Sequence, residues 1–276
     1  MNLVELLKEM NVLCRDNGVV FTDTRRLEVI EEKLLGSLYS CVRGNLFRLY
    51  SKKPLAEMEG KLLLVSSHVD CEARITECFS REESLELLLG TYDNSITNTA
   101  ILSLMMEGSL PEQVVIAFTG DEEEDTQGAT DVIRHLRRMG KKCRAMVLDV
   151  TDYGWVEGAD FTIENNFWKR KIGEKVCGLA ERSGYPWLFV PRNPEKIPDY
   201  VPKSRAYGRE AEPDESWEYD EQDIKVFSLC IPVDGPMHSN QGTLARKRSF
   251  VHYVEVLKSL CIALAKAEKG GDKCPY

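Results

Sequence analysis

The sequence predicts an α/β protein of three layers, in which helices cover both faces of a mostly parallel central sheet. Unbroken runs of Val, Ile, Leu and Phe are typical of strands that are buried on both faces. Apolar residues make up most of four such segments, over residues 61–67, 114–119, 145–150 and 225–231. Segments with helical spacing of apolar residues alternate with these runs, as in sheets built from βαβ units. The sequence therefore predicts an α/β/α sandwich with a mostly parallel central sheet.

The first half of the chain begins with two amphipathic helices. Apolar side chains recur at three- and four-residue spacing over residues 1–16, and a second such stripe runs over residues 25–38. Residues 44–50 alternate between polar and apolar side chains like a half-exposed strand. The buried strand 61–67 and a helix over residues 96–106 follow.

Strands and helices alternate regularly in the second half. Here the strands are expected over 114–119, 145–150, 187–190 and 225–231, and the helices over 129–139, 169–183 and 247–267. We see no internal repeat and no clear linker, and 276 residues suffice for one large core. Residues 1–276 are therefore expected to form a single catalytic α/β domain.

Residues 191–222 differ in composition from the rest of the chain. They contain five prolines and most of a strongly acidic tract. This composition predicts a long surface loop or a lid over a site, and a solvated insertion without a role is the alternative.

Composition excludes several classes of function. A net charge of −9 argues against nucleic acid or an anionic membrane as the main partner and is compatible with metal cations. Nine cysteines without a C-x-x-C pair do not indicate a disulfide scaffold or a structural zinc module. The charged side chains Glu5, Lys8 and Glu9 make the N-terminus unlike a signal peptide, and no apolar run is long enough to span a membrane. A reduced, cytoplasmic protein is expected.

Histidines and carboxylates follow the buried strands or lie close to their ends. Because the carboxyl ends of parallel strands meet at one edge of the sheet, we expect these side chains to converge. The converging residues are His68, Asp70, Asp93, Glu122, Glu123, Asp149 and His238. Mixed imidazole and carboxylate ligands suit Zn²⁺, with Co²⁺ or Mn²⁺ as alternatives. The set exceeds what one tetrahedral catalytic ion needs, and it fits two metals that share a bridging carboxylate.

Each of these residues also has an ordinary structural explanation. His68 is compatible with a core histidine, the acidic block at 121–125 with a solvated turn, and Asp93 with a helix cap. These explanations require independent coincidences at one edge of the sheet, so the whole set favours a metal site.

The order of these motifs resembles that of the co-catalytic dizinc exopeptidases, which include leucyl, glutamyl and tetrahedral aminopeptidases and related zinc carboxypeptidases. The matching motifs are SHVD at 67–70, YDN at 92–94, FTGDEE at 118–123, LDVTDYG at 148–154 and PMHS at 236–239, with GNLF at 44–47 before them. The resemblance runs from about residue 20 to the final helix. It departs from the family at Ile96 and Thr97, where a glycine is usual.

The resemblance implies a role for each matched residue. His68 and Asp149 would hold one metal, Glu123 and His238 the other, and Asp93 would bridge both. Asp70 would accept the second N–H of the His68 imidazole. Glu122 would act as general base and take the proton of a metal-bridging water that attacks the peptide bond.

The resemblance leaves the substrate open. The interval between His68 and Asp93 is too short for the domain that tetrahedral aminopeptidases insert there, and the interval from Asp149 to His238 does not hold an obvious dimerisation domain. An aminopeptidase acting on peptides is the leading interpretation. The alternatives are an N-acyl amino acid deacylase or carboxypeptidase-type amidohydrolase, and a peptidase-like binding protein without turnover.

Overall fold

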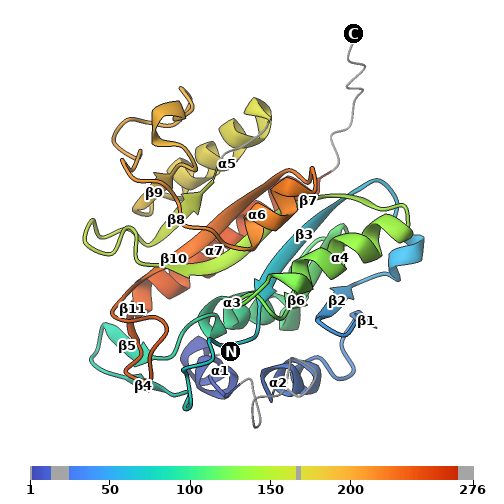
Figure 1. Ribbon diagram of the computed structural model, residues 1–276, viewed down its shortest axis with the longest axis horizontal. Helices are drawn as coiled ribbons and strands as arrows, with labels where there is room; N and C mark the ends of the chain where they lie inside the picture. Colours follow the sequence, from blue (N-terminus) through green and yellow to red (C-terminus); the bar gives the residue numbers. More distant parts are fainter. Residues whose placement is uncertain (1, 14–24, 166–168, 267–276) are drawn as a thin grey trace.

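The computed structural model describes residues 2–13, 25–165 and 169–266, which are organised around a mixed β-sheet (Figure 1). Neighbouring strands follow the order β1-β2-β6-β3-β7-β10-β11-β5-β4, and β8 joins β9 to β10. The strands are β1 (Ser40–Arg43), β2 (Phe47–Ser51), β3 (Lys61–His68), β4 (Ser80–Glu82), β5 (Leu87–Gly90), β6 (Val114–Thr119), β7 (Lys142–Thr151), β8 (Phe161–Glu164), β9 (Trp187–Val190), β10 (Val226–Asp234) and β11 (Thr243–Arg246). The α-helices are α1 (Leu3–Met10), α2 (Arg25–Lys33), α3 (Ser95–Met106), α4 (Gln127–Arg138), α5 (Arg170–Ser183), α6 (Glu215–Glu221) and α7 (Lys247–Ala265).

The centre of the sheet is parallel, as the sequence predicted. Strands β6, β3, β7 and β10 run in one direction, and their carboxyl ends share one edge. In this register Asp149 of β7 lies opposite Cys230 of β10. The outer pairs, such as β2 with β6 and β5 with β11, are antiparallel.

Two hydrophobic cores, one on each face of the sheet, account for the unbroken apolar runs. In β3, Leu63 and Val65 pack into the core with α1, α2, α3, α5 and α7, whereas Leu62 and Leu64 pack into the core with α4 and α6. Successive side chains of a strand point to opposite faces, so a strand covered on both sides is apolar throughout. Figure 1 shows α4 and α6 in front of the sheet. The three-layer prediction is confirmed.

Most expected elements occur, with shifted ends. The first helix ends at Met10 and the second at Lys33, and both are shorter than their apolar stripes predict. The strand expected over 44–50 begins at Phe47, because residues 44–46 connect β1 to β2. The short strands β1, β4, β5, β8 and β11 were not predicted.

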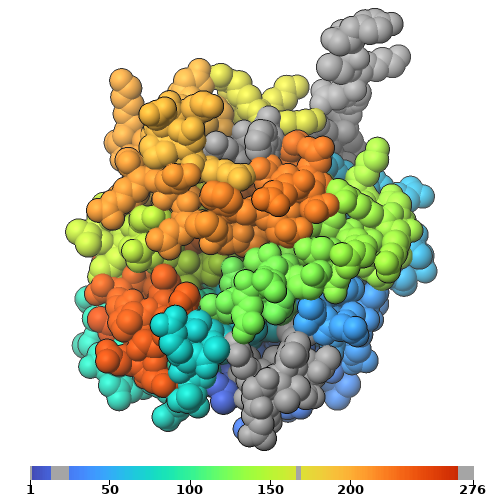
Figure 2. All heavy atoms as spheres, viewed as in Figure 1, coloured from blue at the N-terminus to red at the C-terminus, as the bar shows by residue number. Residues whose placement is uncertain are grey.

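The acidic proline-rich segment 191–222 is not loop throughout. It contains a short 3-10 helix, Pro194–Lys196, and the α-helix α6. Glu215, Ser216 and Tyr219 of α6 are buried, since this helix contacts α4, β7 and β10. In Figure 2 the gold and orange surface of this region lies above the green surface of α4.

Two further sequence expectations concern helices and thiols. Within the described residues, none of the helices is long and apolar enough to cross a membrane. The seven cysteines in the described ranges are free thiols.

Candidate metal centre

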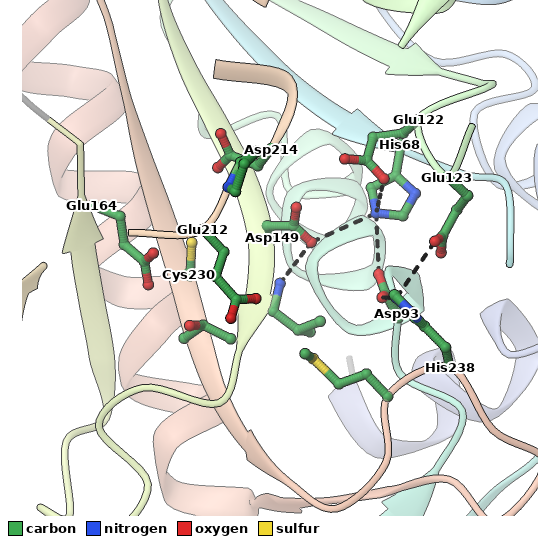
Figure 3. A pocket seen from close by; sticks show the side chains of 14 residues that line it. His68, Asp93, Glu122, Glu123, Asp149, Glu164, Glu212, Asp214, Cys230 and His238 are labelled. Atoms are coloured by element: carbon green, nitrogen blue, oxygen red, sulfur yellow. Dashed lines mark hydrogen bonds and ion pairs between the residues drawn. The ribbon is translucent and has the colours of Figure 1, made fainter. Parts of the chain in front are cut away.

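All seven residues singled out in the sequence meet at the carboxyl edge of the parallel strands. Figure 3 shows them except for Asp70. His68 ends β3, the pair Glu122–Glu123 follows β6, and Asp149 lies near the end of β7. Asp93 directly precedes α3 and its cap, and His238 lies in the turn between β10 and β11. Six of the seven, all except Asp70, line one pocket of about 130 Å³.

The two oxygens of Asp93 face different histidines. Oδ1 lies 3.1 Å from His68 Nε2, and Oδ2 lies 3.2 Å from His238 Nε2. His68 Nε2 is also 3.5 Å from Asp149 Oδ1, and His238 Nε2 is 3.4 Å from Glu123 Oε2. The donors therefore divide into two groups of one histidine and one carboxylate, with Asp93 between them.

Glu122 and Glu123 occupy different places in this arrangement. The Glu123 carboxylate belongs to the group around His238. That of Glu122 lies 3.9 Å from His68 Nε2, at the limit of an ion pair. Of the two glutamates, it is Glu123 that joins His68 and Asp93 in a set, found among the described residues, whose potential ligand atoms all lie within 4.8 Å of one another.

Asp70 lies behind the histidine, away from the pocket. Its Oδ1 is 3.4 Å from His68 Nδ1, and its Oδ2 accepts a hydrogen bond of 3.2 Å from the backbone N–H of Glu123. One carboxylate thus contacts both the strand-end histidine and the loop that carries the glutamates.

The loop carrying the glutamates is held by a close approach of two backbones. Gly128, at the start of α4, donates its N–H to Gly120 O at 3.1 Å. A Cβ at Gly128 would lie 2.3 Å from that oxygen, closer than any real contact. Glycine is the residue that permits such an approach.

Polar side chains of the α3 cap and first turn bond the segment after Asp93 to two strands. Asn94 Nδ2 donates to Leu148 O at 2.7 Å, and Asn98 Nδ2 donates to His68 O at 2.7 Å. The hydroxyl oxygen of Thr97 lies 3.0 Å from Ser67 Oγ. Thr97 is near the position where the exopeptidases that the sequence resembles usually have a glycine. The start of α3 is therefore bonded to the ends of both β3 and β7.

The buried charges shift the pKa values of the cluster strongly. Burial raises the pKa of Glu123 to about 9 and that of Asp149 to about 6, and it raises the pKa of Glu122 well above its usual range. Burial alone would lower the pKa of His68, but the charge of Glu122 and contacts with Asp149 and other acids outweigh it and raise that pKa. The carboxylates repel one another here, so a bound cation would stabilise their ionised forms.

The unsatisfied atoms of the cluster fit a cation. Asp93 Oδ1 and Glu123 Oε1 are buried and accept no hydrogen bond. A buried acceptor left in this way costs about 1–3 kcal/mol. Imidazole nitrogens and carboxylate oxygens are ligands of zinc-class ions, so the residues present fit a metal centre.

The pocket includes residues that the sequence analysis did not select. Glu164, Glu212, Asp214 and Cys230 line it beside the predicted cluster. Glu164 ends the unpredicted strand β8, and Glu212 and Asp214 belong to the acidic tract that was expected to be a surface loop or lid. The sequence signal for Glu164 was its position directly after residues 161–163. That segment is too short to indicate a strand by itself.

Comparison with known proteins finds solved structures with a similar fold. No protein-family model and no curated protein sequence matches the chain. An aminopeptidase from the archaeon Desulfurococcus kamchatkensis superposes with a TM-score of 0.69 at 10% identity, covering 98% of both chains. The TET1 peptidase of Pyrococcus horikoshii gives a TM-score of 0.64 at 13% identity, covering 94% of this chain and 99% of its own.

A third match is a zinc aminopeptidase from Bacillus subtilis. Its TM-score is 0.55 at 14% identity, over 82% of this chain and 51% of the other. The likeness in all three cases is one of fold, and it matches the group of exopeptidases whose motif order the sequence resembles. The chain therefore has the fold of the aminopeptidases to which it is similar.

Proposed function

We propose that this protein is a dinuclear-metal exopeptidase, an aminopeptidase that hydrolyses the first peptide bond of its substrates. The observation that carries the proposal is the position of Asp93, whose two carboxylate oxygens face His68 and His238 separately. A carboxylate in that position suits a bridge between two ions. The shared fold with aminopeptidases supports the same conclusion.

In this proposal the ligands divide as the geometry groups them. His68 and Asp149 would hold one ion, Glu123 and His238 the other, and Asp93 both. Two zinc-class ions at these positions would polarise the scissile carbonyl and acidify a water molecule. Co²⁺ and Mn²⁺ accept the same ligands.

Glu122 is the proposed general base. Its carboxylate lines the pocket beside the cluster and is the one most weakly engaged by the histidines. It would take the proton of the attacking water and return it to the leaving amine. Asp70 would keep His68 in the tautomer whose Nε2 faces the pocket.

The test combines metal analysis with substrate panels. We expect the purified protein to hold up to two zinc-class ions, to hydrolyse peptides with a free α-amine, and to lose activity on chelation. Glu122→Gln should lower kcat by at least about a hundredfold, the lower end of general-base contributions, while the metal content stays unchanged. Glu124→Gln, next to the pair but outside the pocket lining, is the matched control and should keep its activity.

The same panel separates the alternatives. Faster hydrolysis of N-acyl amino acids than of free-amine peptides would identify a deacylase. A metal-loaded protein inert on both classes would identify a binding protein and contradict the proposal, as would a protein that takes up no metal.

A further inference from the structure

The pocket has a second acidic wall, which the proposed metal chemistry does not use. It is formed by Glu164 at the end of β8 and by Glu212 and Asp214 in the segment that leads into α6. Figure 3 shows these three side chains on the far side of Asp149 from His68 and His238. The pocket thus has a metal-binding end and an acidic end.

The strand register places β10 between the strands that carry the two ends of the pocket. Asp149 of β7 pairs with Cys230 of β10, and Cys230 pairs with Thr162 of β8. Glu164 lies two residues after Thr162, so both side chains are on the same face of the strand. Two strand spacings separate β7 from β8, about 10 Å. Cys230 lies between them, and its small thiol leaves the space above it open to the pocket.

The acidic end carries no compensating charge. Among the described residues, no Lys, Arg or His forms an ion pair with Glu164, Glu212 or Asp214. The donors to Glu164 and Asp214 are neutral hydroxyl and N–H groups, such as Thr162 Oγ1 at 2.6 Å from Glu164 Oε1. Buried carboxylates are normally paired with a cation.

The burial of Glu164 favours a positively charged ligand at this end of the pocket. Glu164 is only 4% exposed, and burial raises its pKa to about 8, with the charge of Asp214 adding to the rise. A cation bound beside Glu164 would stabilise its ionised form.

We propose that Glu164, with Glu212 and Asp214, selects substrates whose N-terminal residue is lysine or arginine. This inference rests on the proposed aminopeptidase function and adds the substrate class. The substrate's α-amine and scissile carbonyl would lie at the metal-binding end. The long side chain would run over Cys230 and place its cationic head at the acidic wall. Lysine and arginine combine an apolar stem with a terminal cation, which matches a pocket of this length and charge.

The first experiment compares a four-carbon side chain with and without a terminal ammonium group, which are those of lysine and norleucine. Hydrolysis of the 4-nitroanilides of lysine, arginine, norleucine and glutamate is measured with the metal-loaded protein. We expect kcat/KM for lysine to exceed that for norleucine by about tenfold to a hundredfold, the range of one charged hydrogen bond. Equal values for lysine and norleucine overturn the inference but leave the aminopeptidase proposal standing.

A binding measurement keeps the inference testable without turnover. Calorimetric titration with L-lysinamide and L-norleucinamide should show tighter binding of lysinamide, by about the same factor. If no nitroanilide is hydrolysed, the aminopeptidase proposal fails, and the ratio of the two affinities still decides the inference. Equal affinities contradict it.

Substitutions test whether the acidic wall determines the preference for lysine over norleucine. Glu164→Gln keeps the acceptor for Thr162 and should lower the lysine-to-norleucine ratio of kcat/KM and of affinity by about tenfold or more. Glu212→Gln, at an exposed position on the rim, should lower the ratio less. Glu210→Gln removes the same charge from the same segment outside the pocket and should leave the ratio unchanged. An unchanged ratio in a folded Glu164→Gln protein would contradict the assignment.

Discussion

His238 Nε2 lies 3.2 Å from Asp93 Oδ2, although the two residues are 145 positions apart in the chain. The histidine side chain is 46% exposed, whereas that of Asp93 is 8% exposed. His68, on the other oxygen of Asp93, is 2% exposed. One half of the centre is therefore open to solvent, and the other half is enclosed.

A candidate ligand of the solvent-exposed half can be removed by substitution without changing the enclosed half. In His238→Ala the exposed ion loses a ligand, and the enclosed group of His68, Asp149 and Asp93 remains. We expect the metal content after dialysis to fall from two ions to one, as measured by elemental analysis. His135→Ala, outside the pocket, is the control and should keep two ions. Retention of two ions by His238→Ala would contradict the grouping of ligands.

Asp70 should affect metal binding without being a ligand. Because it contacts His68 Nδ1 and the Glu123 backbone, Asp70→Asn weakens the orientation of one ligand in each group. We expect a loss of metal affinity of about tenfold to a hundredfold, the usual effect of such partners. Competition with a chromogenic chelator measures it. Complete loss of binding would instead indicate that Asp70 coordinates an ion itself.

Glu215 should make stability depend on pH. This residue is buried, accepts a hydrogen bond from Ser66 Oγ at 2.8 Å, and has its pKa raised by burial to about 7. The folded protein therefore binds more protons at this group than the unfolded chain between about pH 4.3 and pH 7. Stability contributed by the group is fully present below about pH 4.3 and is lost as the pH rises to 7.

The slope of this loss approaches about 1.4 kcal/mol per pH unit within the window. Urea unfolding of the wild type and of Glu215→Gln at several pH values measures it, and the variant should lack this part of the slope. Glu221→Gln, at an exposed position of the same helix, should behave like the wild type. Parallel pH profiles for Glu215→Gln and the wild type would show that this assignment is wrong.

Gly128 should be intolerant of even one added methyl group. In Gly128→Ala the new Cβ would lie 2.3 Å from Gly120 O and 2.8 Å from Leu46 O, both backbone atoms that cannot rotate away. We expect a loss of about 1–3 kcal/mol in the free energy of unfolding and a displaced Glu122–Glu123 loop. Denaturant titration and metal affinity report the two effects. Gly208→Ala, which meets no atom within 4 Å and, like Gly128, has no positive φ, is the matched control and should keep the stability of the wild type.

The central fold could be predicted because a strand buried on both faces has a sequence that is mostly apolar. In the run 114–119 every residue before Thr119 is apolar, and the structure buries all six. Strands at the margins of the sheet lack this apolar pattern. Ser40–Arg43 and Ser80–Glu82 are polar and partly exposed, and their conformation comes from pairing with β2 and β5. Such tertiary pairing is not encoded in local composition.

The convergence of the candidate site residues could be predicted for the same reason. His68 and Glu123 were selected because each follows a recognisable buried strand. Glu164 was missed because its strand has four residues, and Asp214 was missed because prolines and acids around it indicated a loop. The helix α6 depends on burying Tyr219 and Glu215 against the sheet, which a window of sequence does not reveal.

The position of β10 has a consequence for how the protein is made. Among the four parallel strands it is the last in sequence, yet it pairs with β7 over seven residue pairs and also holds β8 and β11. A chain leaving the ribosome must present the edge of β7 unpaired until residues 226–234 emerge, and an unpaired edge promotes aggregation. His238 emerges later still. A nascent chain thus cannot assemble the complete cluster of histidines and carboxylates until the sheet has closed.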